Sequence, residues 1–149
     1  MKLAEALSIR KDLQKRIDQL QVRLCRNAKI QEGDEPAEQP SELLKELNTC
    51  LNQLQNLIFK INEANIRIVK DGKSLTEMLA EREVLLKRIG VLREVFTTAS
   101  QSQDRYSRSE IKFVSTVDVK DLNKTIDGYS QQLRKLDITI QQLNFSEEV

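Results

Sequence analysis

Histidine is absent from the 149-residue chain, and glycine, proline, cysteine and the aromatic residues are all scarce. Without histidine, Ser-His-Asp and Cys-His catalysis, Glu-x-x-His di-iron bundles and His-containing zinc sites are excluded. The four glycines are scattered and form no phosphate-binding loop. We therefore expect no enzyme and neither a cofactor nor a metal site.

Long apolar runs and an excess of charge of one sign are also missing. No stretch of 18 apolar residues occurs, so we expect no membrane-spanning segment. Near the N-terminus, Glu5 and Arg10 interrupt the apolar run that a secretory signal would need, which favours a cytoplasmic location. The formal net charge of +1 argues against a dedicated nucleic-acid binder, for which a strongly basic face is expected.

Two cysteines, Cys25 and Cys50, are too few for a disulfide framework. We interpret them as free thiols in a reducing compartment. The alternative is a redox crosslink between the first two helices, because antiparallel pairing would bring Cys25 near residue 46, one turn from Cys50.

The residues that are abundant predict an all-α fold. Hydrophobic residues make up 39% of the chain and charged residues 32%, which is typical of one helix-rich domain. Apolar spacing predicts helices over about residues 2–31, 41–69, 75–99 and 118–145. An acidic linker at 31–40 and a long loop at 100–117 separate them, with a short extended segment near 111–117.

In each predicted helix, apolar residues recur at steps of three, four or seven, as in coiled coils. The row of the first helix is Leu3, Ala6, Leu13, Ile17, Leu20 and Leu24. The row of the second is Leu44, Leu47, Leu51, Leu54, Ile58, Ile61, Asn65 and Ile68. The third helix has two rows, one of Leu75, Leu79, Leu86, Ile89 and Phe96, and one of Met78, Leu85, Leu92 and Ala99. The row of the fourth is Val119, Leu122, Ile126, Tyr129, Leu133, Leu136, Ile140 and Leu143.

Asp71 and Gly72 are predicted to end the second helix, and Ser74 with Glu77 forms the capping-box signature that starts the third. This short turn predicts that the second and third helices are antiparallel neighbours. The expected architecture is a set of long antiparallel helices that forms a coiled-coil-like hairpin or a four-helix bundle. The fourth helix packs on its own chain or is exchanged in an assembly.

Two places are candidates for binding. Arg105, Tyr106, Arg108 and Lys112 form a basic cluster with one aromatic residue, which favours an interface or, alternatively, an anion or single-stranded nucleic-acid site. Asn65 is the one polar residue in the row of the second helix. It is interpreted as a register residue, with a ligand contact as the alternative.

Several segments together resemble the septicolysin-like family of small bacterial helical proteins. They are INEAN (Ile61–Asn65), GKSLTEMLAERE (Gly72–Glu83), RYSRSEIK (Arg105–Lys112), TVDV (Thr116–Val119) and LDITIQQLNF (Leu136–Phe145). The resemblance implies an all-helical fold with long antiparallel helices. The family name implies a pore-forming cytolysin, but the resemblance implies no catalytic residues.

The leading hypothesis is a non-enzymatic helical interaction or scaffold protein that forms homo-oligomers in the cytoplasm. One alternative is the cytolysin that the family name implies. A second alternative is binding of nucleic acid or another anion through the basic loop 105–112.

Overall fold

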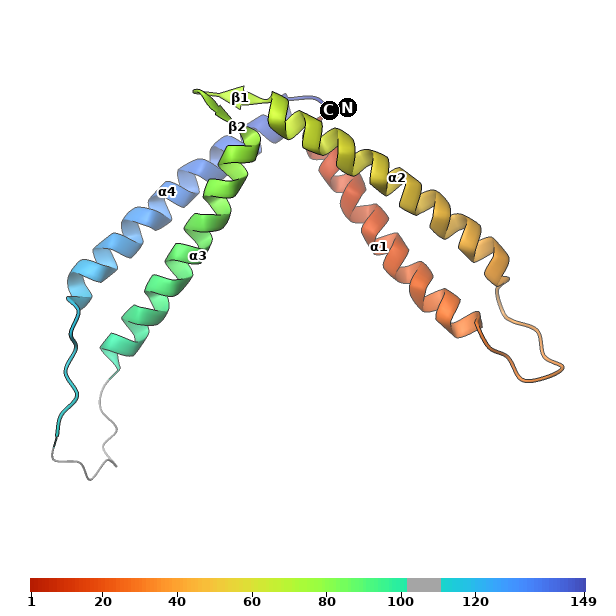
Figure 1. The fold of residues 1–149 in the computed structure, drawn as a ribbon, viewed down its shortest axis with the longest axis horizontal. Helices are drawn as coiled ribbons and strands as arrows, with labels where there is room; N and C mark the ends of the chain where they lie inside the picture. Colours follow the sequence, from red (N-terminus) through yellow and green to blue (C-terminus); the bar gives the residue numbers. More distant parts are fainter. Residues whose placement is uncertain (102–110) are drawn as a thin grey trace. The chain divides into compact units, whose positions relative to one another are not determined.

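The computed structural model describes residues 1–101 and 111–149 (Figure 1). Its helices are α1 (Leu3–Asn27), α2 (Pro40–Arg67), α3 (Leu75–Ser100) and α4 (Val119–Ser146), and two short strands, β1 (Val69–Lys70) and β2 (Lys73–Ser74), lie between α2 and α3. The all-α prediction is confirmed. Every helix boundary falls within a few residues of its predicted position.

The chain divides into two compact units. Unit 1 comprises Met1–Ser74 with Gln142–Val149, and unit 2 comprises Leu75–Gln141. The expected single domain and the expected antiparallel pairing of the second and third helices stay predictions.

In unit 1, α1 and α2 form an antiparallel hairpin. Arg16 of α1 pairs with Glu46 of α2, which fixes the register of the two helices, and Arg23 pairs with Glu38 of the linker before α2. The predicted row of α1 is confirmed, since none of its members is exposed. Its core cluster consists of Leu20, Leu43 and Cys50, with Leu13, Ile17, Leu24 and Leu47 packed against it.

The predicted row of α2 is half wrong. Leu47, Leu54, Ile61 and Ile68 are buried or half-buried as expected. The other buried positions, however, belong to the row Leu43, Cys50, Leu57 and Ala64, one residue before the predicted Leu44, Leu51, Ile58 and Asn65. Two neighbouring seven-residue rows of α2 are both largely apolar. Periodicity alone does not show which of the two rows is buried. Packing against α1 determines it.

Cys25 and Cys50 are both free. The Arg16–Glu46 pairing brings Cys50 level with Asp12 of α1, whereas Cys25 lies two residues beyond Arg23 and therefore near the linker. The register thus rules out the crosslink considered above. Cys50 is buried in the core, and Cys25 is exposed.

A β-hairpin follows α2, which ends at Arg67 rather than at the predicted Asp71-Gly72 stop. Val69 pairs with Ser74, and Lys70 pairs with Lys73. Asp71 has φ 51° and Gly72 has φ 79°, the two positive values of a type I′ turn. The Asp-Gly pair was identified as a turn, but its hairpin was missed because it was interpreted only as a helix stop.

The two ends of the chain are joined in unit 1 (Figure 1). The backbone N–H of Leu3 donates to the carbonyl of Glu147 at 2.9 Å, and that of Val149 donates to the carbonyl of Met1 at 3.0 Å. Arg67 Nη2 donates to the carbonyl oxygen of Glu148 at 2.7 Å. We call these three hydrogen bonds the terminal clasp. They connect the start of α1, the end of α2 and the residues after α4.

In unit 2, α3 and α4 lie side by side and antiparallel (Figure 1). Arg82 Nε donates to Asp137 Oδ1 at 2.6 Å, and the Arg88 guanidinium lies 4.9 Å from the centre of the Tyr129 ring. The predicted row of α4 is confirmed, because all eight members are buried or half-buried. On α3 one predicted row is partly wrong, since Leu79 and Leu86 are exposed. The buried positions of this helix are Leu75, Met78, Leu85 and Ile89.

Candidate interaction surfaces

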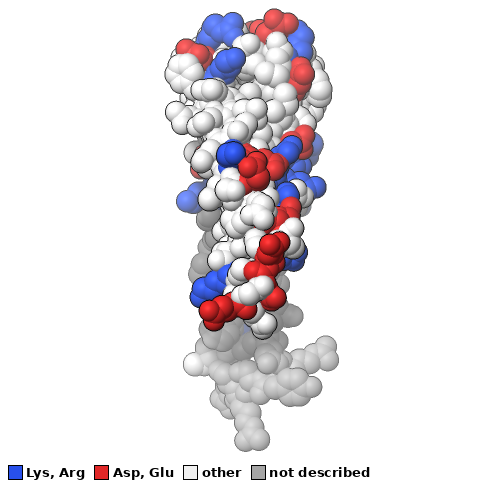
Figure 2. Space-filling view, turned by 90° about the vertical axis from the view of Figure 1, so that its right-hand side faces the viewer, with Lys and Arg blue, Asp and Glu red and all other residues white. Residues whose placement is uncertain are grey.

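Most of the predicted basic cluster lies outside the described residues, namely Arg105, Tyr106 and Arg108. Lys112 is described and is exposed. Figure 2 shows one face of the molecule, on which acidic and basic side chains are interspersed rather than gathered by sign. This face offers no extended basic surface to a nucleic acid.

The segment predicted to be extended near 111–117 forms no strand with any described residue. Ile111 is 79% exposed, Phe113 85% and Val114 80%. The Ser115 hydroxyl donates to the carbonyl of Val117 at 2.9 Å, and Asp118 caps α4 by accepting from the N–H of Asp121 at 3.0 Å. The polar residues thus form hydrogen bonds with neighbouring residues of the same segment, whereas the apolar side chains are exposed at the surface.

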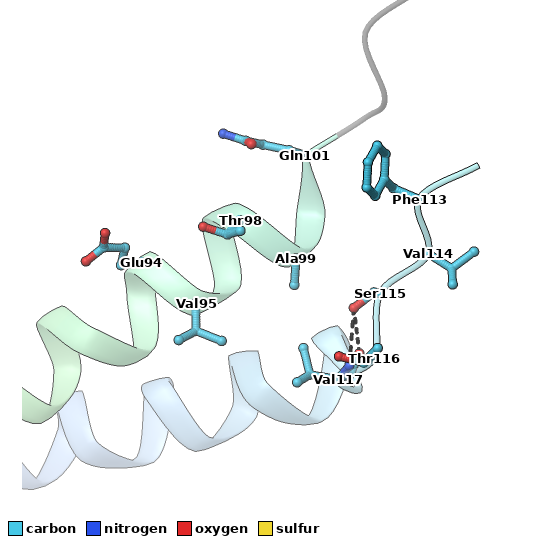
Figure 3. Close-up of a pocket in the computed structure, with 10 residues that line it drawn as sticks. All are labelled: Glu94, Val95, Thr98, Ala99, Gln101, Phe113, Val114, Ser115, Thr116 and Val117. Carbon is cyan, nitrogen blue, oxygen red and sulfur yellow. Dashed lines mark hydrogen bonds between the residues drawn. The ribbon is translucent and has the colours of Figure 1, made fainter. Parts of the chain in front are cut away.

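This segment and the last turns of α3 enclose a pocket of about 710 Å³. Figure 3 shows Val95 and Ala99 of α3 facing Val117 across it, with Phe113 at its edge and Val114 pointing away. We call this pocket the apolar mouth. Its lining also includes Glu94, Thr98 and Thr116. Its apolar lining residues suit it to receiving an apolar group.

A further apolar surface lies along α3. Val84 is 56% exposed, Val91 54% and Val95 40%. Seven residues separate Val84 from Val91, and four separate Val91 from Val95, so the three side chains share one side of the helix. That side leads into the apolar mouth through Val95.

The third surface belongs to α2 and consists of the residues that were wrongly predicted to lie in its seam. Leu44 is 49% exposed, Leu51 42% and Ile58 38%, and they are spaced by seven residues. We call these three residues the outer row. Asn65 continues the row and is half-buried beside Ala64, which is 1% exposed. Its role as a register residue stays a prediction.

Two ion pairs formed by arginines of α1 lie on the other side of the hairpin. Arg16 Nε donates to Glu46 Oε1 at 2.8 Å, and this contact raises the pKa of Arg16. Arg23 Nε donates to Glu38 Oε2 at 3.0 Å, and the hydrogen bonds from Arg23 lower the pKa of Glu38. Asn27 Oδ1 accepts from the N–H of Glu38 at 3.0 Å, which ties the linker to the end of α1. These contacts are structural.

No group of three or more His, Cys, Asp or Glu side chains in the described ranges could hold a metal ion. None of the helices in these ranges is long and apolar enough to cross a membrane.

Comparison with known proteins identifies the family. Residues 10–149 match the model of a family of unknown function, DUF6847. The chain belongs to this family. It also resembles the crystal structure of a functionally unknown conserved protein from Corynebacterium diphtheriae, with 39% sequence identity and a TM-score of 0.93 over 100% of this chain and 98% of that one. No curated protein matches.

The resemblance to septicolysin-like proteins is therefore wrong, because the matching family is DUF6847 and its function is unknown. Apart from RYSRSEIK (Arg105–Lys112), most of which lies outside the described residues, the segments that carried the resemblance belong to long helices and to the turn and cap residues beside them. Such residues report helix packing rather than an activity. The outer row could have been found from sequence, since Leu44, Leu51 and Ile58 remain in excess once Leu43, Cys50 and Leu57 are assigned to the seam.

Proposed function

We propose that this protein is a non-enzymatic helical interaction module that self-associates. One observation carries the proposal: large apolar side chains are exposed on surfaces of both units. Leu44 and Leu51 are 49% and 42% exposed in unit 1, and Val84, Val91 and Phe113 are 56%, 54% and 85% exposed in unit 2. Apolar groups aligned along helices in this way are typical of surfaces that other helices cover.

The sequence supports the non-enzymatic part of the proposal. Without histidine, a general base with an unperturbed pKa near neutrality is missing, and the chain has no phosphate-binding loop. A cytoplasmic location belongs to the same proposal, because free cysteines such as Cys25 and Cys50 are the rule in a reducing compartment.

Size-exclusion chromatography with light scattering tests self-association directly. Over a hundredfold range of protein concentration, we expect the measured mass to reach at least twice the 17.2 kDa of one chain. A mass of one chain across the whole range would contradict the proposal. Repeating the measurement in high salt shows whether charge contributes, because salt screens exposed charges but leaves apolar contacts intact.

A further inference from the structure

The two sides of the α1–α2 hairpin differ in chemistry. Consecutive helical residues are about 100° apart, so residues two apart point in nearly opposite directions. Gln14 therefore lies on the side opposite Arg16, and Leu44 on the side opposite Glu46. One side of the hairpin has the ion pairs. The other, which we call the amide–leucine face, consists of Leu7, Gln14 and Gln21 of α1 with Leu44, Asn48 and Leu51 of α2.

The α2 half of this face is free of charge. Between Glu46 and Lys60, residues 47–59 include no Asp, Glu, Lys or Arg. Asn48 is exposed, as are Leu44 and Leu51. A partner of strong charge would find no counter-charge here. A surface of the same kind, apolar with amides, matches it without burying an unpaired charge.

The α1 half has three charged residues close to Gln14, with Arg10 and Lys11 before it and Asp18 after it. Arg10 lies four residues before Gln14, and Asp18 lies four residues after it. Neither forms an ion pair with another described residue. When two copies of α1 pack antiparallel about Gln14, Arg10 of each copy lies beside Asp18 of the other. A two-fold interface requires this self-complementarity.

The same axis aligns α2 with its counterpart. The Arg16–Glu46 pairing places Gln14 level with Asn48, so an axis through Gln14 also passes Asn48. Antiparallel packing about Asn48 then brings Leu44 of one copy next to Leu51 of the other. Both helices of the hairpin thus find complementary residues at one register.

The available area is sufficient for a stable contact. At 1.5 Å per residue, α1 is roughly 37 Å long, and two adjacent helices are roughly 20 Å wide. This side of the hairpin, over the whole length of α1, therefore offers on the order of 700 Å² per copy, close to the roughly 800 Å² per partner of a standard interface.

We propose that a second copy of this chain docks on the amide–leucine face, so that two α1–α2 hairpins pack antiparallel about an axis through Gln14 and Asn48. The inference rests on the self-association proposed above and specifies its surface. Arg10 and Asp18 determine the register, and Leu44 and Leu51 supply the buried apolar contact.

Charge reversal tests the register. Asp18→Arg places two cations beside each other in the dimer and should raise the dissociation constant on the order of tenfold or more. The double variant Arg10→Asp/Asp18→Arg restores opposite charges and should return the constant towards that of the wild type. Circular dichroism confirms that each variant remains helical. No weakening by Asp18→Arg, or no recovery in the double variant, would overturn the proposed register.

Crosslinking tests the axis and does not depend on affinity. In a background in which Cys25 is replaced by serine, Gln14→Cys places one thiol of each copy beside the axis, and oxidation should join the chains. Gln19→Cys is the matched control, because Gln19 is exposed on the same helix and, five residues after Gln14, points about 140° away from it. Equal crosslinking of the two variants would contradict the axis.

Two further variants show whether the dimer interface lies on the amide–leucine face or at the apolar mouth. They are Leu51→Glu and Phe113→Ser. The first should abolish dimerisation, and the second should leave it unchanged. The opposite result would place the interface at the mouth and overturn this inference while self-association stands. A wild-type chain that stays monomeric would overturn both proposals.

Discussion

At the residue scale, Glu38 shows how the acidic linker is attached to α1. Arg23 donates hydrogen bonds to its carboxylate, and Asn27 accepts one from its backbone N–H. The linker residue was predicted only as part of an exposed acidic loop. The sequence gives the charges of Arg23 and Glu38, but their pairing depends on where α2 begins, which is a property of the folded hairpin.

The hydrogen bonds from Arg23 lower the pKa of Glu38, so the ionised form stabilises the folded state. This stabilisation is present above the pKa of the unfolded chain and is lost as pH falls through the lower pKa of the folded chain. Glu38→Gln should therefore lower the melting temperature at neutral pH, and the difference from wild type should disappear in acid. Glu32→Gln, in the same exposed linker, is the control and should have no effect. A pH-independent difference for Glu38→Gln would contradict this account.

At the element scale, the positions of the helices could be predicted from the sequence. Which side of each helix is buried was harder to predict. The α4 row was predicted in full because only one row of that helix is apolar throughout. On α2, two neighbouring rows are both apolar, because they are made of adjacent apolar pairs: Leu43 and Leu44, Cys50 and Leu51, and Leu57 and Ile58. Which member of each pair is buried is decided by contact with α1, so single-helix periodicity is insufficient.

The β1–β2 hairpin provides an element-scale prediction. Gly72 has φ 79°, a conformation that L-residues rarely adopt, so Gly72→Ala should destabilise the fold by roughly 1 kcal/mol. Gly90→Ala is the matched control. Gly90 lies within α3, and a Cβ there would have no neighbour within 4 Å, so this change should stabilise by up to about 1 kcal/mol. Urea denaturation measures both changes. Effects of the same sign would show that the turn conformation does not matter.

At the scale of the whole chain, the sequence predicted the helices but not how their ends are joined. The contact between residues 2 and 148 has no periodic signal, because it links the two ends of the sequence through backbone groups. Backbone hydrogen bonding is nearly independent of residue type. Arg67, which completes the clasp from α2, also has no pattern that distinguishes it from other exposed cations.

The terminal clasp should stabilise unit 1 measurably. Removing residues 147–149 deletes the bonds from Leu3 to Glu147, from Val149 to Met1 and from Arg67 to Glu148. At roughly 1 kcal/mol net for each, the loss is about 3 kcal/mol at most. Amide hydrogen exchange locates the effect, because the Leu3 N–H loses its acceptor and should exchange faster. Phe145→Ser, at a side chain that is 72% exposed, is the control and should leave Leu3 protected. If Leu3 exchanges equally slowly in the shortened chain, its protection comes from the packing of α1 alone, and the clasp contributes nothing.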